Sequence, residues 1–262
     1  MASERSMLPA GTLQDKVVLI TGAGTGIGEA AAIGFARAGA KLMLTGRRLE
    51  LVEKVAEAIR REGGEASAIR TDVAEEDDVR SMVDQTLTRF GRLDCAFNNA
   101  GVEQTPGRVA EMSVKDLDYT WAVKGRGTFL CMKHEISAMI KSAGGGSIVN
   151  HGSVVSERTF AQYPAPAATQ GAIPGLTKSA AAGHGPDNIR VNMIFTGCVL
   201  TKERASAPNA EDRIAGLLKR TALNRVGTAE DVAAMAGWLL SDYSSFVTGV
   251  CVPVDGGNLA KQ

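Results

Sequence analysis

Residues that bind metals or form disulfides are scarce in this sequence. Only four cysteines occur among 262 residues, far apart and without a CxxC spacing. The three histidines are also not spaced as metal ligands are. We therefore expect no metal site, and we interpret the cysteines as buried thiols in a reducing compartment, with disulfides as the alternative. The residues are Cys95, Cys131, Cys198 and Cys251, and His134, His151 and His184.

An excess of charge and a long apolar run are also missing. The 29 basic and 29 acidic residues balance, so no electrostatic attraction to nucleic acid or to an anionic membrane is expected. Met1–Gln14 has no apolar core and is not a signal peptide. The longest uncharged stretch, Thr159–Thr177, contains three prolines and is not a transmembrane helix. These absences predict a cytoplasmic protein without nucleic acid or membrane as a partner.

Strand-like and helix-like patterns alternate along the whole chain. Repeated strand–helix units predict an α/β fold, a single-domain doubly wound parallel sheet of about seven strands, over residues 1–262. The expected strands are Val17–Ile20, Leu42–Thr45, Ala66–Arg70, Leu93–Phe97, Ser147–Asn150, Arg190–Ile194 and Val250–Val254. The expected helices are Gly26–Ala38, Leu49–Glu62, Glu75–Phe90, Val114–Lys141, Ala167–Ala182 and Thr228–Ser241.

Residues 196–225 form the one long interruption of this alternation. The segment contains a short amphipathic stretch with Ile214, Leu217 and Leu218. Ligands of such sheets bind outside the carboxyl ends of the strands, where this segment lies. We expect a substrate lid, with an ordinary surface excursion as the alternative.

A glycine-rich turn, Thr21–Gly28, follows the apolar run Lys16–Ile20 and opens a helix. A strand, a tight glycine turn and a helix N-terminus form a cradle for a diphosphate, because the backbone N–H groups point outward and glycine lets the phosphates come close. The helix carries Ala31, Ala32, Phe35 and Ala36 on its expected apolar side. The pattern predicts a nucleotide site.

The end of the second expected strand indicates which nucleotide binds. An acid at this place hydrogen-bonds the adenosine ribose hydroxyls in folds of this kind. Here the strand continues into Arg47 and Arg48, and the first acid is Glu50. Guanidinium groups suit a 2′-phosphate, so NADP(H) is expected rather than NAD. The alternative is that both arginines belong to a solvated helix start.

Six sequence motifs together resemble one family. They are Thr21–Gly28 (TGAGTGIG), Asp72-Val73, Asn98–Gly101 (NNAG), Gly146–Asn150 followed by Ser153, Gly175–Ala181 (GLTKSAA) and Val252–Gly257 (VPVDGG). Over essentially its whole length the chain resembles a short-chain dehydrogenase/reductase of the single-domain type. This resemblance implies an oxidoreductase, a homodimer or homotetramer, and a nicotinamide cofactor. The implied cofactor-binding residues are Gly22, Gly24, Thr25, Gly26, Ile27, Gly28, Arg47, Arg48, Asp72, Val73, Asn99, Ala100, Gly101, Gly197 and Thr201.

The catalytic positions depart from the family pattern. The family uses an Asn, a Ser and a Tyr-x-x-x-Lys, in which Tyr transfers the proton, Lys lowers the Tyr pKa, Ser orients the carbonyl and Asn holds a relay water. Ser153 is present, but the Tyr position is Pro166, the Lys position is Gln170 and the Asn position is Lys124. Pro174 also falls inside the active-site helix and favours a kink there.

Three residues are candidates for the missing acid. Lys124 supplies a positive charge, and a desolvated lysine can act as an acid or base. Tyr163 lies three residues before the family position. His151 precedes Ser153 by two residues and can titrate near neutral pH. The alternatives are a surface lysine, a packing tyrosine and a core or rim histidine.

Three functions fit these observations. The first is an atypical NADP(H)-binding reductase or dehydrogenase of a small carbonyl or alcohol, with Ser153, Lys124 and Tyr163 as catalytic residues. The second is an enzyme of the same fold with non-redox chemistry such as isomerisation, dehydration or cyclisation. The third is a non-catalytic nucleotide-binding protein.

Overall fold

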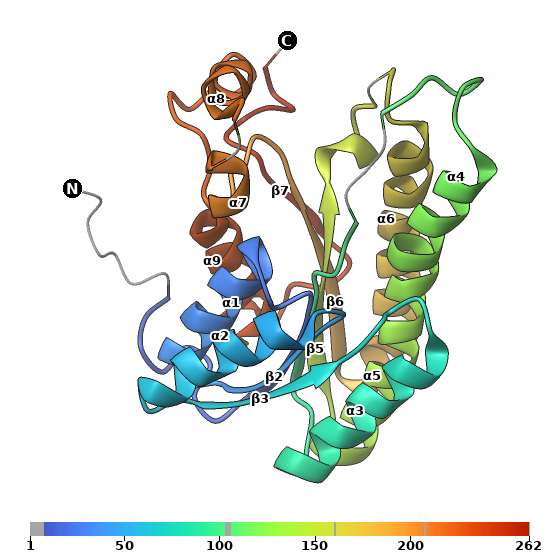
Figure 1. The fold of residues 1–262 in the computed structure, drawn as a ribbon. Coiled ribbons are helices and arrows are strands. Elements are labelled where there is room, and N and C mark those ends of the chain that lie inside the picture. Colours follow the sequence, from blue (N-terminus) through green and yellow to red (C-terminus); the bar gives the residue numbers. More distant parts are fainter. Residues whose placement is uncertain (1–7, 103–105, 160, 207, 262) are drawn as a thin grey trace.

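The computed structural model describes residues 8–102, 106–159, 161–206 and 208–261. In this part of the chain seven parallel strands form one sheet with the order β3-β2-β1-β4-β5-β6-β7 (Figure 1). The strands are β1 (Val17–Thr21), β2 (Lys41–Gly46), β3 (Glu65–Arg70), β4 (Cys95–Asn98), β5 (Gly146–Ser153), β6 (Ile189–Thr196) and β7 (Cys251–Val254). The order reverses between β1 and β4, which confirms the predicted doubly wound sheet.

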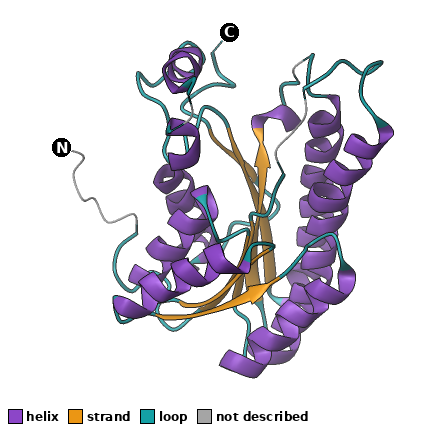
Figure 2. Ribbon diagram, viewed as in Figure 1, coloured by secondary structure: helices purple, strands orange, loops and turns teal. Residues whose placement is uncertain are grey.

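Helices cover both faces of the sheet (Figure 2). One face packs against α1 (Gly26–Arg37), α2 (Leu49–Arg61) and α9 (Ala229–Leu240). The other packs against α3 (Glu76–Phe90), α5 (Gly127–Ala143) and α6 (Pro164–His184). No helix in the described ranges is long and apolar enough to cross a membrane.

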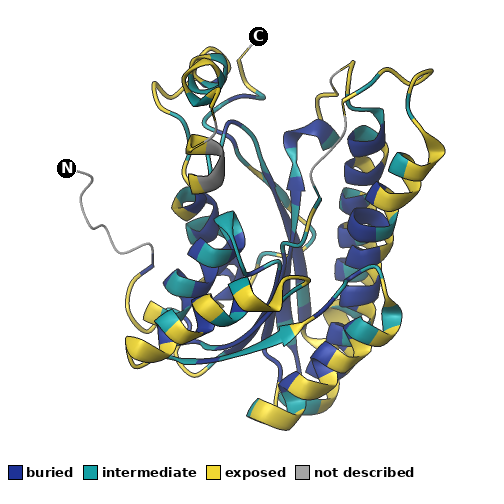
Figure 3. Cartoon of the chain, viewed as in Figure 1, coloured by how far each residue is buried: buried dark blue, intermediate teal, exposed yellow. Residues whose placement is uncertain are grey.

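The core lies between these layers, and the central strands are its most buried part (Figure 3). All five residues of β1 are buried, as expected of a parallel strand that is covered on both faces. The rings of Phe35 and Phe97 pack with their centroids 6.3 Å apart. The apolar side of α1 differs slightly from the prediction, because Ala30 is buried and Ala36 is only partly buried.

The helix predicted over Val114–Lys141 is interrupted. It consists of α4 (Val114–Thr120), a π-helical segment η1 (Trp121–Arg126) and α5. A Cβ atom at position 125 would lie 2.8 Å from the Trp121 ring, so glycine is needed for the indole to rest against this turn. π-Helical turns are frequent at functional sites, and Lys124 lies in this one.

Helix α6 begins at Pro164, three residues before the predicted start. Pro164 and Pro166 lie in its first turn, where backbone N–H groups have no helical partner and their loss costs nothing. The helix continues through Pro174 to His184.

The cysteines are all free thiols, but one expectation about them is wrong. Cys95, Cys131 and Cys198 are buried, whereas Cys251 on β7 is partly exposed. Strand β7 lies at the edge of the sheet, so one of its flanks has no neighbouring strand.

Candidate active site

A cleft of about 1250 Å³ lies at the carboxyl ends of the strands. Its walls come from the glycine turn after β1, the ends of β2, β4, β5 and β6, and the segment that contains α7 (Lys202–Ala205) and α8 (Ala210–Leu218). The point where the strand order reverses, between β1 and β4, opens into it. This is where ligands bind in open parallel sheets. All of the predicted cofactor residues except Gly28 line this cleft.

Gly28 does not line the cleft, but the shape of the glycine turn depends on it. A Cβ atom at position 28 would lie 2.1 Å from the carbonyl oxygen of Gly22, so only glycine allows this approach. Gly22 itself has a φ of 68°, a conformation that glycine adopts freely. The Nδ2 group of Asn99 donates to the carbonyls of Thr21 and Gly22, at 3.1 Å each. The turn is thus braced by the residues that follow β4.

At the end of β2, Arg47 and Arg48 both line the cleft. Arg47 donates to the Tyr119 hydroxyl at 2.6 Å, and its guanidinium carbon lies 5.9 Å from the centre of that ring. Arg48 is the N-cap of α2 and is exposed. Glu50 is not among the lining residues, so the two arginines meet no carboxylate from their own strand end.

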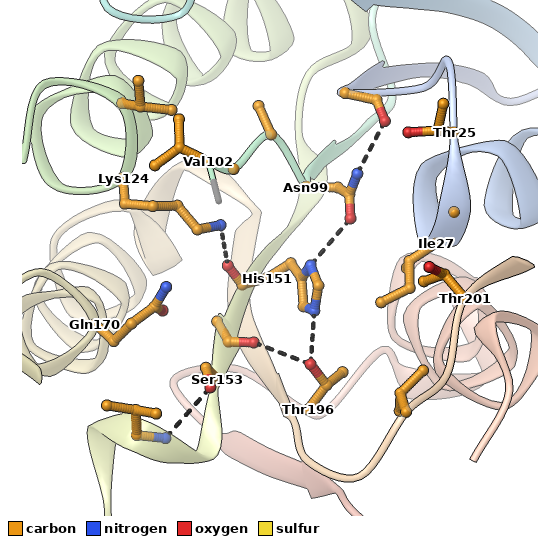
Figure 4. Close-up of a pocket in the computed structure, with 18 of the residues that line it drawn as sticks. Thr25, Ile27, Asn99, Val102, Lys124, His151, Ser153, Gln170, Thr196 and Thr201 are labelled. Atoms are coloured by element: carbon orange, nitrogen blue, oxygen red, sulfur yellow. Dashed lines mark hydrogen bonds between the residues drawn. The ribbon is translucent and has the colours of Figure 1, made fainter. Parts of the chain in front are cut away.

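Lys124 is buried in the floor of the cleft. Its side chain points from η1 toward the end of β5, and Nζ donates to the carbonyl oxygen of His151 at 2.9 Å (Figure 4). The residue is only 5% exposed. Burial lowers the pKa of Lys124 to about 8, because desolvation disfavours the charged form. It is therefore a buried amine that can exchange a proton near neutral pH, and not a surface lysine.

His151 is held by two hydrogen bonds and does not titrate near neutral pH. Its Nδ1 lies 2.9 Å from Oδ1 of Asn99, and its Nε2 lies 3.2 Å from the Thr196 hydroxyl. Since the Asn99 amide nitrogen donates to carbonyls, Oδ1 accepts from Nδ1–H, and Nε2 is left as the acceptor. Burial, with the Lys124 charge nearby, lowers the pKa of His151 to about 3. The proposed titration of His151 near neutral pH is therefore wrong.

Ser153 ends β5 and lines the cleft, as the sequence predicts. Its Oγ accepts a long hydrogen bond of 3.4 Å from the backbone N–H of Val155. The hydroxyl proton is then available to a ligand oxygen. Tyr163, at the N-cap of α6, also lines the cleft. The three predicted catalytic residues therefore share one cavity.

The two family positions on α6 hold no acid and no cation. Pro166 is buried in the first turn. Gln170 is 2% exposed and reaches the cleft from the next turn. Its Oε1 has no hydrogen-bond partner among the described residues, and a Cβ atom on Gly152 would lie 3.0 Å from it. A buried amide oxygen without a partner costs free energy that a donor group of a bound ligand relieves.

Two of the six charged lining residues were not predicted from the sequence. Arg213 and Arg220 come from α8 and the turn that follows it, within the segment expected to form a lid. Arg213 lies on α8 and Arg220 lies in the turn after Leu218, so no helical spacing in the sequence identifies the pair.

Comparisons with known proteins agree with this geometry. The family model described as enoyl-(acyl carrier protein) reductase matches residues 22–258. A 2,5-dichloro-2,5-cyclohexadiene-1,4-diol dehydrogenase from Sphingobium indicum is 38% identical over 94% of this chain and 97% of its own. A cyclohexanol dehydrogenase from Acinetobacter is 34% identical over 94% of this chain and 96% of its own. The crystal structure of a levodione reductase superposes with a TM-score of 0.90 at 32% identity, over 95% of this chain and 99% of that one.

Proposed function

The chain belongs to the short-chain dehydrogenase/reductase family, and from this premise we propose that it is an NADP(H)-dependent oxidoreductase in which Lys124 replaces the usual tyrosine as proton donor. The substrate class is a small carbonyl compound and its alcohol, as the names of the related dehydrogenases suggest. The observation that carries the proposal is the buried Lys124 amine in the same cleft as Ser153.

The cleft fits a dinucleotide. The glycine turn lines the cleft at the N-terminus of α1, where backbone N–H groups would hold the diphosphate, and Arg47 and Arg48 line it at the end of β2, where they would bind a 2′-phosphate. Asp72 and Val73 line the same end of the cleft and would border the adenine. When bound, the nicotinamide of NADPH supplies the hydride.

Side chains of the protein then orient the carbonyl and supply the proton. Ser153 donates a hydrogen bond to the carbonyl oxygen and orients it. Lys124 in its ammonium form gives a proton to that oxygen, and the neutral amine is retained by its hydrogen bond to the His151 carbonyl. Gln170, whose amide oxygen has no described partner, accepts a hydrogen bond from the substrate or a water. His151 holds Asn99 and Thr196 in place and exchanges no proton, since it stays neutral.

One observation favours a second candidate, a non-redox reaction in the same cleft. Pro166 and Gln170 stand where the family carries its Tyr and Lys, so the usual proton-transfer pair is lost while a basic amine is retained. Lys124 in its neutral form is a suitable base for isomerisation or dehydration. This candidate gains support if a product forms while the amount of NADPH stays constant.

Cofactor choice is a direct test of the arginines at the end of β2. We expect NADPH to bind at least about tenfold more tightly than NADH, which corresponds to about 1.4 kcal/mol and is modest for a charge-assisted contact. Replacing Arg47 and Arg48 together by serine should abolish this difference. Calorimetric titration measures both affinities. Arg61→Ser, at the far end of α2, is the matched control. Equal affinities of the unmodified chain for the two cofactors would contradict the assignment.

Assembly is a further prediction from the resemblance. We expect a homodimer or homotetramer in which the long helices α5 and α6 pack against a second subunit. Trp121 of η1 and Phe129 of α5 leave 45% and 49% of their surface exposed, as uncovered side chains of such an interface would. Light scattering at micromolar concentration should give a multiple of 27.4 kDa. A mass of one chain would contradict this prediction.

A further inference from the structure

The charges that line the cleft are strongly unequal, although the chain as a whole carries no net charge. The charged lining residues are Arg47, Arg48, Asp72, Lys124, Arg213 and Arg220. Asp72 is the one carboxylate among them, and it lies at the nucleotide end. A concave surface lined by charges of one sign concentrates ligands of the opposite sign.

The nucleotide accounts for only part of this positive charge. Arg47 and Arg48 follow β2 and are assigned to its 2′-phosphate. Arg213 and Arg220 come instead from the segment between β6 and α9, with α8 beyond the carboxyl ends of the strands (Figure 1). Leu217, which lies on α8 with Arg213, also lines the cleft. This part of the cleft, the α8 wall, therefore presents two guanidinium groups and one apolar side chain.

The position of the α8 wall in the cleft indicates that its charges contact the substrate. Arg220 lies in the turn after α8, where its carbonyl oxygen accepts from Nδ2 of Asn258 at 3.1 Å, and it lines the cleft together with Asn258 and Cys198. Cys198 follows the end of β6, the strand that pairs with β5 and aligns Thr196 with Ser153. Both arginines thus line the same cleft as Ser153, the serine proposed to bind the carbonyl.

Arg213 is also available for a ligand. It is partly exposed in the cleft, and no carboxylate of the described side chains lies within ion-pairing distance of it. The acids on its own helix, Glu211 and Asp212, are exposed and do not line the cleft. A guanidinium in a partly enclosed site forms its strongest contacts with a carboxylate, often through two parallel hydrogen bonds.

We infer that the substrate carries a carboxylate, which Arg213 binds together with Arg220 while the reacting carbonyl faces Ser153 and Lys124. Leu217 then packs against the carbon chain between the two groups. This inference rests on the proposed function, since it names the substrate class of the same cleft. It narrows that class from small carbonyl compounds to oxo acids and the corresponding hydroxy acids.

Binding of matched pairs of probes tests the inference without requiring turnover. The probes are 4-oxopentanoate, 5-oxohexanoate and 7-oxooctanoate, each compared with its neutral methyl ester. Calorimetry with the full chain, with and without NADP⁺, should show at least one acid binding about tenfold or more tightly than its ester. The preference should shrink as salt is raised, because the contact is ionic.

Point variants test whether Arg213 causes the preference for the acid over its ester. Arg213→Gln should weaken binding of the acid by about tenfold while changing the affinity of the ester less than about twofold. Arg213→Glu should remove the preference entirely. Lys219→Gln is the matched control, because Lys219 is exposed beside α8 and does not line the cleft. Thermal melts of every variant confirm that it is folded.

Two results would overturn the inference. One is equal binding of acid and ester at every chain length. The other is an Arg213→Gln variant that loses affinity for NADP⁺ instead of for the acid, since the arginine would then belong to the cofactor. The result of this binding experiment is independent of whether the proposed reductase activity is found. Acid binding that depends on Arg213, without oxidation of NADPH by any carbonyl compound, would support the inference and contradict the reductase.

Discussion

Replacing Lys124 by methionine should lower the rate of carbonyl reduction by at least about tenfold, because a placed general acid contributes about 10²- to 10⁴-fold. Methionine fills a similar volume, so the buried site between η1 and β5 keeps its packing while the amine is lost. NADPH affinity should stay within a few-fold, since the glycine turn and the arginines are untouched. Initial rates of NADPH oxidation with cyclohexanone as the probe, together with calorimetry, measure both quantities.

The same assignment predicts the pH dependence of the unmodified enzyme. Lys124 must be protonated to act as an acid, and its pKa is lowered to about 8 by burial. The rate of reduction should therefore be constant below about pH 8 and fall above it as the ammonium form is lost. Alcohol oxidation needs the neutral amine, so its rate should rise toward about pH 8 and level off. In Lys124→Met both inflections should disappear.

Lys141→Met is the matched control for this variant. Lys141 lies at the other end of α5, is exposed and does not line the cleft. It should keep both the rate and the pH profile. Full activity in Lys124→Met would remove Lys124 from the mechanism and leave Tyr163, the other ionisable side chain proposed for proton transfer, as the candidate donor.

Restoring the family pattern should have the opposite effect. The double variant Pro166→Tyr/Gln170→Lys places a phenol and an ammonium one helical turn apart on α6, with the ammonium at the buried position beside Gly152. We expect reduction of simple ketones to increase by about 10²-fold, the lower end of the range for general acid catalysis. Initial rates with cyclohexanone and NADPH measure the gain.

The single variants separate the roles in this pair. Pro166→Tyr alone should gain less, because no lysine lowers the phenol pKa, and Gln170→Lys alone should gain nothing. Circular dichroism and NADPH binding show whether each variant is folded. A folded double variant that binds NADPH and shows no gain in rate would mean that α6 does not present position 166 to the substrate.

The fold was predictable from the sequence because its signals are local and repeated. Each apolar run such as Val17–Ile20 is followed by a helical pattern, and only a parallel sheet satisfies such an alternation. The glycine turn was also predictable from its motif. The motif requires glycine at position 28 because this residue approaches the Gly22 carbonyl closely. Element boundaries were less accurate, as the start of α6 at Pro164 shows.

The chemistry of the site was less predictable because it depends on contacts between distant segments. No sequence feature near Lys124 shows that the helix becomes π-helical at η1 and that the lysine side chain is buried there. Burial and the charge of Lys124 keep His151 neutral, and its ring is held by Asn99 and Thr196, about fifty residues before it and forty-five after it along the chain. The position of Arg213 follows from how α8 lies beyond the carboxyl ends of the strands, which no local pattern determines.

The central claim is that this cleft transfers hydride from NADPH to a carbonyl carbon despite the lost tyrosine and lysine. NADPH deuterated at the transferring position of nicotinamide C4 tests this claim directly, with mass spectrometry of the product from cyclohexanone or from an oxo acid that binds. We predict an alcohol that carries one deuterium on its carbinol carbon, formed in equal amount to the NADPH consumed. A product without deuterium, formed while NADPH stays unchanged, would contradict the account.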